Sequence, residues 1–536
     1  MNSRRLRVGI ISRKNLGSLN SLSCRVLFKN ALKIVESRFN ACCCFLNSST
    51  NSNKKEIALK KLTSSCDVIL ELAPGQMFDI KAKSIPRVFF ALGFMSNPFN
   101  LMASFNRKLM TANSVLFSCK ADLEMFNKIF GKTGRSMGYI VPFPLEVNEF
   151  KPQSELENKR MRERFGIGGD VFLILYAGRI NVQKNIHTLL KIFREAIKRF
   201  PQTRLCIAGE EDRGGFEEFG ISNNGYTGYI RRKCLEYGIA DKVIFTGKLK
   251  REDLISLYSS ADVFMNCTIS QYENFGYSQV EAMACGTPVI CSHWGGLKDT
   301  VIHGKCGYHM PTILSNNGVK VDWQSGLRQL IGLLEDKDRL KEMSRQAREH
   351  AKLNFSFDRF AKMLEFVLLD TMKRNNKNKK HHYLLKIKKE NPHFMNLFME
   401  YLYVNRKNYK KGPVCVNSPK SLFFRRNYSH YKSFIKAYSS LSGSEMLKRN
   451  GSIPYFLQDV RLMYKGQRLY IQDPLWPARY RLEDWQFRIA SVIDGNRSLE
   501  DINSNFIHRG FKKRRDSLKR FYKHLAEEGV VSFLSN

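Results

Sequence analysis

The sequence predicts an α/β fold in which two doubly wound parallel sheets face a cleft, followed by a small C-terminal α+β module. Two observations predict the sheets. Short apolar stretches alternate with longer amphipathic ones through roughly the first 370 residues, and this alternation occurs twice, with a break at 138–152. A third observation, the change to a basic and poorly periodic sequence after Thr371, predicts the separate module. At 536 residues the chain is too long for a single core.

Short stretches rich in apolar and β-branched residues are the expected strands of the two sheets. In chain order they are “LRVGIIS”, “CDVILEL”, “RVFFAL”, “SVLFSC”, “VFLILYAG”, “RLCIAG”, “KVIFTG”, “DVFMNC” and “TPVICS”. Amphipathic segments such as “NIHTLLKIFREAIKRF” lie between them and are expected to be helices. Strands that alternate with helices in this way are typical of parallel sheets covered on both faces. We therefore predict one domain over residues 1–150 and a second over 151–372.

The last part of the chain carries much of its positive charge. The sequence holds 88 Lys and Arg against 49 Asp and Glu, a formal net charge of +39, and residues 371–536 supply 34 of these cations but only 13 of these acids. Such an excess favours an anionic partner, and nucleic acid, a membrane surface and anionic substrates all fit. We predict a basic linker or extension over 373–451 and an ordered module over 452–536.

The ordered module is expected to hold a hairpin, three helices and a final strand. “RLMYKGQRLYIQ” is typical of a hairpin with Lys465 and Gly466 at its turn, and Ser498 with Asp501 is typical of a helix start. The segments “RLYIQDPLWPARYRLEDWQFRIASVIDGNRSLEDI” and “LKRFYKHLAEEGVVSFL” resemble the PqqD-like winged-helix fold, which implies binding of a leader peptide. Three alternatives stay open: a winged helix that binds nucleic acid through “HRGFKKRRDSLKR”, a structural appendage, and contact of 373–426 with anionic lipid.

Cysteine usage and apolar runs bear on compartment and metal content. The 13 cysteines include the adjacent Cys42, Cys43 and Cys44 but form no C-x-x-C pair, so the sequence predicts neither a disulfide framework nor a metal site. Reduced, buried thiols indicate the cytoplasm. No secretory signal is visible, and no apolar run reaches the roughly 20 residues of a membrane span. We expect a cytoplasmic protein. If it contacts a membrane, we expect that contact to be peripheral, at the inner membrane surface.

The stretch “ENFGYSQVEAMACGTPVI” places two carboxylates, Glu273 and Glu281, around a glycine at the start of a helix. One interpretation is structural: Ser278 and Glu281 form a capping box, and the following Gly-Thr-Pro ends the helix. It does not explain Glu273. The loop follows an expected parallel strand and precedes a helix, which is where open α/β sheets bind ligands and where free N–H groups favour phosphate. Gly276 allows close approach of the backbone. Glu273 could then accept from sugar hydroxyls and Glu281 from vicinal hydroxyls such as those of a ribose.

A second loop offers positive charge. “YAGRINVQKNIHTLL” places Arg179 and Lys184 between an expected strand and the following helix. A guanidinium fork and an ammonium point charge five residues apart suit a diphosphate leaving group. Joined to the carboxylate loop of the same domain, the pair predicts a site for a nucleotide sugar. A glycoside hydrolase would also use two carboxylates, but it has no need of these cations.

These pieces together resemble the retaining glycosyltransferases of the GT-B fold, in family four (glycosyl transferases group 1). The segments “YAGRINVQKNIHTLLKIF”, “RLCIAGEED”, “KVIFTGKLKREDLISLYSSADVFMNCT”, “ENFGYSQVEAMACGTPVICSHWGG” and “VIHGKCGYHM” match in order, and the resemblance covers about residues 5 to 370. It implies two Rossmann-like domains, with an acceptor-side domain at 1–150 and a nucleotide-sugar-binding domain at 151–372. It implies a hexosyltransferase that uses a UDP-, GDP- or ADP-sugar as donor substrate, retains anomeric configuration, and needs no cofactor or metal. The acceptor, whether peptide or protein, glycan or lipid, is not indicated.

The resemblance also implies residue roles. Arg179 and Lys184 would hold the donor diphosphate. Glu281 would bind the ribose. Glu273 would bind the transferred sugar, helped by the backbone of Asn274, Phe275 and Gly276.

Two features depart from the family pattern. Members usually carry a first-domain histidine near the reacting sugar, whereas this chain has no histidine before His187 and offers Ala91, Leu92 and Gly93 in the corresponding region. The loop after the first strand holds one glycine, Gly17, where the family often has two. These departures leave an alternative open: a catalytically weakened GT-B protein that binds nucleic acid or a partner through its basic tail.

Overall fold

A computed structural model describes most of the two predicted domains and part of the C-terminal module. The residues that it describes are 6–12, 22–45, 52–72, 85–91, 114–130, 138–212, 225–270, 273–315, 318–377, 441–442, 451–457, 460–465, 468–472, 479–507, 515–528 and 530–535.

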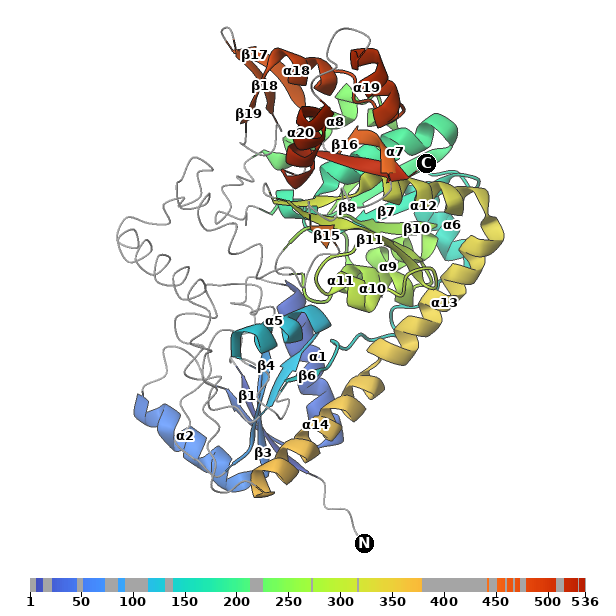
Figure 1. The fold of residues 1–536 in the computed structure, drawn as a ribbon. Helices are drawn as coiled ribbons and strands as arrows, with labels where there is room; N and C mark the ends of the chain where they lie inside the picture. Colours follow the sequence, from blue (N-terminus) through green and yellow to red (C-terminus); the bar gives the residue numbers. More distant parts are fainter. Residues whose placement is uncertain are drawn as a thin grey trace.

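The first domain is built on a six-stranded parallel sheet (Figure 1). The strand order is β2-β1-β3-β4-β5-β6. Its strands are β1 (Arg7–Ser12), β2 (Asn40–Phe45), β3 (Val68–Glu71), β4 (Arg87–Ala91), β5 (Ser114–Phe117) and β6 (Gly138–Ile140). The accompanying helices are α1 (Leu22–Arg38), α2 (Ser52–Ser65) and α5 (Lys120–Phe130). Every residue of β3, β4 and β5 is buried, as expected for central strands with both faces covered.

The second domain holds another six-stranded parallel sheet, of order β12-β11-β10-β7-β8-β9. Its strands are β7 (Phe172–Ala177), β8 (Thr203–Ala208), β9 (Val243–Gly247), β10 (Val263–Asn266), β11 (Val289–Ser292) and β12 (Gly307–Met310). The strand order reverses at β7 and β10, which lie side by side although two strands, three α-helices and two 3₁₀ helices separate them in the described chain. A reversal of this kind opens a crevice beyond the carboxyl ends of the two strands.

Helices cover this sheet and lead back to the first domain. They are α6 (Glu155–Arg164), the short 3₁₀ helices η2 (Val182–Lys184) and η4 (Ala240–Lys242), α7 (Ile186–Arg199), α8 (Tyr226–Glu236), α9 (Arg251–Ser260), α10 (Tyr277–Ala284), α11 (Leu297–Thr300), α12 (Trp323–Glu335), α13 (Lys337–Phe355) and α14 (Phe357–Lys377). Helix α7 illustrates why these segments pack on the sheet. Its apolar residues recur on one face, and Leu189, Leu190 and Phe193 are buried in the core.

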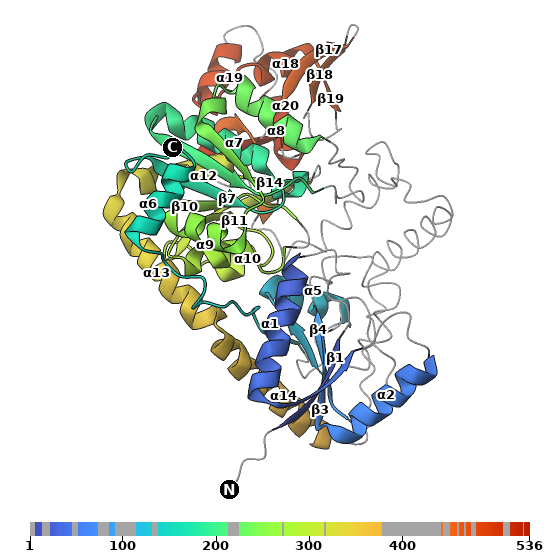
Figure 2. The ribbon, with the colours of Figure 1, turned by 180° about the vertical axis from the view of Figure 1, so that it is seen from behind.

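Two segments among the described residues pass between the two domains. The segment 141–150 leads from β6 into the second domain, and the junction of α13 and α14 leads back. Helix α14 then packs on α1 and β4 of the first domain (Figures 1 and 2). The hydroxyls of Ser114 and Thr371 lie 2.6 Å apart. The two passages meet, because the Leu145 amide donates to the Phe355 carbonyl at 2.7 Å.

The elements after Gly451 pack against the second domain, on the side away from the first (Figures 1 and 2). Strand β15 (Leu441–Ser442) pairs in parallel with β13 (Thr312–Ser315), whose other neighbour is β14 (Gly318–Val321). Tyr455 donates its hydroxyl to Asp322 at 2.6 Å, and the Trp323 indole donates to the Phe456 carbonyl at 3.0 Å. Tyr455 and Leu457 thus join the core of the second domain.

The described part of the module contains strands and helices at the expected places. They are β16 (Gly451–Phe456), β17 (Arg461–Lys465), β18 (Arg468–Gln472), β19 (Arg479–Leu482), α18 (Asp484–Ala490), α19 (Leu499–Ile507), α20 (Arg515–Glu527) and β20 (Val531–Ser535). The predicted hairpin is confirmed by the antiparallel pairing of β17 with β18. Lys465, predicted at the turn, is instead the last residue of β17 and pairs with Arg468, while Gly466 lies outside the described residues. Ser498 and Asp501 bond reciprocally at the start of α19, as expected. The PqqD-like assignment remains a prediction.

The nine predicted strands of the two sheets are confirmed, but others were not predicted. The sequence did not indicate β2, which contains the three adjacent cysteines, or β6 and β12, which complete the two sheets. Most of the predicted linker over 373–451, the loop with Gly17, and Leu92 with Gly93 lie outside the described residues. Among the helices that the structure describes, none combines the length and apolar character needed to cross a membrane.

Candidate functional site

The predicted site residues gather where the strand order of the second sheet reverses. Arg179 and Lys184 follow β7, and Glu273 follows β10, so both loops leave neighbouring parallel strands at the same edge of the sheet. This is the position at which doubly wound sheets bind ligands.

The loop after β7 is held in place by its own backbone and side chains. The Tyr176 hydroxyl donates to the Arg179 carbonyl at 2.7 Å, and the Asn181 side chain accepts from the Lys184 amide at 3.1 Å. Asn185 adopts a left-handed conformation (φ 55°) and donates its side-chain amide to the Cys267 carbonyl at 3.0 Å, in the loop that follows β10. Local hydrogen bonds of this kind fix the directions in which Arg179 and Lys184 leave the loop.

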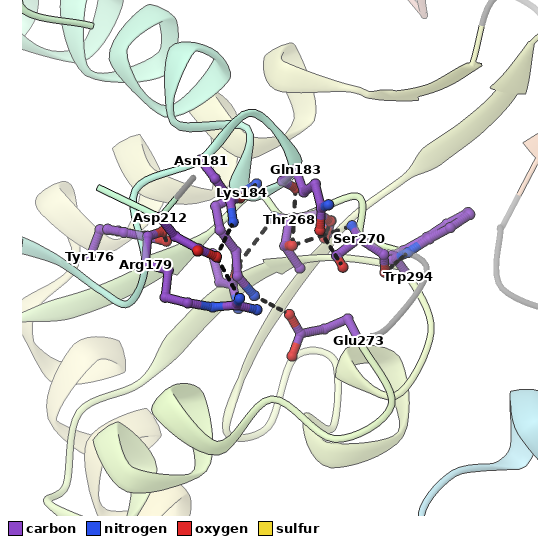
Figure 3. Close-up of polar contacts among 12 residues, drawn as sticks. Tyr176, Arg179, Asn181, Gln183, Lys184, Asp212, Thr268, Ser270, Glu273 and Trp294 are labelled. Carbon is purple, nitrogen blue, oxygen red and sulfur yellow. Dashed lines mark hydrogen bonds and ion pairs between the residues drawn. The ribbon is translucent and has the colours of Figure 1, made fainter. Parts of the chain in front are cut away.

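Gln183 joins the two loops through a buried hydrogen-bond network (Figure 3). Its carbonyl accepts from the Thr268 hydroxyl at 3.1 Å, and its side-chain oxygen accepts from the Ser270 hydroxyl at 3.0 Å. The Trp294 indole, from the loop after β11, donates to the Ser270 carbonyl at 2.8 Å. Because every group is buried, each missing partner would cost free energy, and the network therefore defines one arrangement of the loops.

Lys184 and Glu273 form a direct ion pair, shown in Figure 3. Their side chains are only 15% and 13% exposed. The Glu273 backbone is also fixed: its amide donates to the Ser270 carbonyl at 3.1 Å, and its carbonyl accepts from the Gly296 amide at 2.8 Å. The structure thus brings together the two residues that the sequence placed on separate loops.

Arg179 has a different carboxylate partner. Its guanidinium lies 2.5 Å from Asp212, which follows β8, and the Asn181 side chain donates to the same Asp212 oxygen at 3.3 Å. The Arg179 side chain is 56% exposed, and in Figure 3 it extends in the direction of the Lys184–Glu273 pair. Both predicted cations are therefore present at this edge of the sheet, each with its charge balanced by an acid.

The three residues after Glu273 contact the rest of the protein through their backbone and packing. The Ser118 hydroxyl, which follows β5 of the first domain, donates to the Asn274 carbonyl at 2.9 Å. Phe275 is buried against Phe143 of the first crossing segment, with ring centroids 5.1 Å apart. Gly276 has a φ of +82° and begins α10, and an added Cβ there would lie 2.4 Å from Leu297. The glycine is required by both conformation and packing.

Glu281 lies apart from the ion pair, one turn into α10. It is partly buried and accepts from the Tyr258 hydroxyl at 3.0 Å. Burial raises the pKa of its carboxyl to about 7, although the Tyr258 hydrogen bond opposes that shift. The capping-box interpretation is wrong: Gly276 is the N-cap of α10, no side chain caps it, and the Glu281 carboxylate points to another helix.

Several site residues were not predicted from the sequence. Asp212, Gln183, Tyr258 and Ser118 lie on other loops or helices than their partners, so no local pattern marks them. The one available signal was position, since Asp212 and Ser118 follow the carboxyl ends of parallel strands. Within the described ranges, no three His, Cys, Asp or Glu side chains gather as a metal site would require. Ala91 is the last residue of β4, where a first-domain histidine was sought.

Two Rossmann-like domains with a site at the reversal point of the second define the GT-B architecture, and solved structures share it. The structure of Anabaena Alr3699/HepE in complex with UDP-glucose superposes with a TM-score of 0.50 over 68% of this chain and 100% of that chain, at 17% sequence identity. At this identity the likeness concerns the fold alone.

Residues 157–350, which make up most of the second domain, match the family model described as “Glycosyl transferases group 1”. Curated relatives include mannosylfructose-phosphate synthase from Agrobacterium fabrum, 33% identical over 31% of this chain and 35% of that protein. D-inositol 3-phosphate glycosyltransferase from Corynebacterium urealyticum is 31% identical over 41% of this chain and 48% of that protein. A GDP-mannose-dependent phosphatidylinositol monomannoside mannosyltransferase from Mycolicibacterium smegmatis is 30% identical over 37% and 48%. The chain thus spans between about a third and a half of the length of these relatives.

Proposed function

We propose that the protein transfers a sugar from a nucleotide-sugar donor to an acceptor, with retention of anomeric configuration. The observation that carries the proposal is the Lys184–Glu273 ion pair at the reversal point of a domain that matches the group 1 glycosyltransferase model. Relatives and structural neighbours whose names include UDP-glucose or GDP-mannose support a nucleotide sugar as donor. The proposal includes a first domain that binds the acceptor and no requirement for a metal ion.

The residues divide the donor between them. Arg179 and Lys184 are proposed to hold the diphosphate, because a cation stabilises the negative charge that develops on a departing phosphate. Glu273 is proposed to accept from hydroxyls of the transferred sugar, with the backbone of 274–276 beside it. Glu281 is proposed to accept from the ribose.

The ion pair suggests how the site is kept ready for the donor. Without a donor, Glu273 compensates the charge of Lys184, and Asp212 compensates that of Arg179. A bound diphosphate would replace Glu273 as the partner of Lys184. Glu273 would then be free to accept from the sugar, so that one exchange of partners prepares both ends of the bond to be broken. The network through Gln183 keeps the two loops in register while partners change.

A donor screen tests the proposal. The melting temperature of the full chain is measured with UDP-glucose, GDP-mannose and ADP-glucose in turn. If the Kd is micromolar, a nucleotide-sugar concentration about 100 times higher should stabilise the folded state by about 2.7 kcal/mol. Lys184→Ala should remove most of the melting shift, since a charge-assisted hydrogen bond to phosphate is worth about 1.5–3 kcal/mol. Lys341→Ala, a change of a lysine on the distant helix α13, is the matched control. A shift that is the same in both variants would contradict the assignment.

The C-terminal module is proposed to recruit the acceptor. The module contacts the second domain through Tyr455 and Phe456. A peptide or protein acceptor should bind with little salt dependence, whereas a phosphate-rich one should lose affinity steeply between about 50 and 200 mM salt. Titration of the full chain with acceptor candidates at both salt concentrations separates the two.

A further inference from the structure

Glu281 and Glu273 have different side-chain partners. The carboxylate of Glu281 accepts a hydrogen bond from a tyrosine hydroxyl, whereas that of Glu273 pairs with the ammonium group of Lys184. Tyr258 of α9 is fully buried, and its hydroxyl donates to the Glu281 carboxylate at 3.0 Å. The Tyr258 carbonyl in turn accepts from the Thr287 hydroxyl, and its ring packs on Phe264, with centroids 5.9 Å apart. The tyrosine is thus fixed at both ends and can hold the carboxyl in one orientation.

The charged groups around Glu281 do not neutralise it directly. Arg251, on the same helix as Tyr258, is engaged by Glu149 and Glu146 of the first crossing segment. Cys285 is one turn along α10, and Arg348 of α13 donates to the carbonyl of Ala284 and to two carbonyls of the crossing segment. In the described part of the chain, Tyr258 is therefore the side chain that makes a hydrogen bond to the Glu281 carboxyl, while Arg251 and Glu149 act on it from a distance.

A ribose changes this balance. Its two vicinal hydroxyls donate, and hydrogen bonds donated to a carboxyl group favour the ionised form. A tyrosine hydroxyl that also donates would add to them. We propose that Glu281 loses a proton to solvent when a nucleotide sugar binds, and that Tyr258 is a positioning residue that keeps the carboxylate aimed at the ribose and eases its ionisation. This inference rests on the proposed function, since it takes the ribose of the donor as the ligand of Glu281.

The sign of the resulting pH dependence follows from the pKa of Glu281. Burial raises that pKa to about 7 in the free protein, so the carboxyl is largely protonated at pH 6 and largely ionised at pH 8. If the ribose lowers the pKa below 5, the Kd should become about tenfold smaller between pH 6 and pH 8. About half a proton should be released per molecule bound at pH 7. The nucleotide sugar has no terminal phosphate that would titrate in this range and obscure the effect.

Calorimetric titration of the full chain with UDP-glucose and with GDP-mannose tests the inference, in two buffers of different ionisation enthalpy at pH 6, 7 and 8. The buffer dependence of the heat gives the number of protons released. Tyr258→Phe should raise the pKa of Glu281 and move the affinity profile to higher pH by about 0.5–1 pH unit. Tyr480→Phe is the matched control, because Tyr480 also donates to a carboxylate, Glu528 at 2.7 Å, but lies in the C-terminal module.

Glu281→Gln provides a second measurement that does not depend on how well Tyr258→Phe folds. In this variant both the pH dependence and the proton release should disappear. Proton release that persists in Glu281→Gln, or an affinity that does not change with pH in the unmodified protein, would overturn the inference while leaving the donor site in place. Failure of both sugar nucleotides to bind at any pH would instead overturn the proposed function.

Discussion

Replacement of Glu273 by glutamine should tighten the binding of free UDP while it abolishes transfer. Glu273 is in direct contact with Lys184, and both side chains are mostly buried. Two unit charges about 4 Å apart attract by about 4 kcal/mol at an effective dielectric constant near 20, and after desolvation a charged hydrogen bond retains about 1.5–3 kcal/mol. UDP must replace that interaction to reach Lys184. Glutamine leaves Lys184 with a hydrogen bond to a neutral amide oxygen, which lacks the attraction between two unit charges. About 1–1.5 kcal/mol is therefore recovered, or roughly a tenfold smaller Kd.

The assay is calorimetric titration with UDP and with UDP-glucose, beside measurement of product formation. Glu273→Gln should increase the affinity for UDP-glucose less than that for UDP, because the sugar hydroxyls lose the carboxylate that accepts their hydrogen bonds. The rate of transfer should fall by at least about 100-fold. Glu335→Gln is the control: Glu335 pairs with Arg199 at a distant, exposed position, and its change should leave both affinities alone. If Glu273→Gln weakens UDP as much as Lys184→Ala does, the exchange of partners proposed for Lys184 is refuted.

Three further predictions concern local structure. Gly276→Ala should destabilise the protein and disturb the donor loop, because φ is +82° and the new Cβ would meet Leu297; Gly225→Ala, at φ +77° with open space around it, should cost only the conformational strain of about 1–2 kcal/mol. Glu281→Gln should raise the Tm of the ligand-free protein more at pH 8 than at pH 5.5, since a carboxyl whose folded pKa is raised to about 7 loses its favourable protonated state as the pH increases through that value. Tyr455→Phe should lower the free energy of unfolding by about 1–3 kcal/mol, measured by denaturant titration, because it leaves a buried carboxylate of Asp322 without its hydroxyl donor.

The sequence was sufficient to predict the two parallel sheets because their strands are short, apolar and regularly spaced between amphipathic helices. It was also sufficient to predict that Lys184 and Glu273 lie at the same edge of the sheet. The carboxyl ends of neighbouring parallel strands meet there, so their two loops could be assigned to one site before any contact was known. Strand β2 was not predicted, since “NACCCF” lacks both alternation and β-branched residues. Periodicity reports which face of an element is buried but not which partner lies there.

The same limit explains the errors and omissions at the site. A local pattern, Ser278 with Glu281, suggested a cap, but the carboxyl is bonded to Tyr258, which lies 23 residues earlier on another helix. Asp212 could not be paired with Arg179 because nothing in either segment encodes their separation. The contact of Tyr455 with Asp322 joins residues 133 positions apart across a long basic stretch. Contacts of this kind depend on how whole elements pack.

The return of α14 to the first domain has a mechanical consequence. A chain that passes once between two bodies leaves them free to twist as well as bend, whereas here two of the described segments run between the domains and are tied together where the Leu145 amide meets the Phe355 carbonyl. The segment 141–150 and the junction of α13 and α14 together act as a hinge, and they favour rotation of the domains about a single axis. Phe275 packs on both Phe143 and Phe355 beside that axis, so the loop carrying Glu273 sits near the pivot, where an opening of the domains displaces atoms least. Glu273 therefore keeps its place while the far edges of the two domains move.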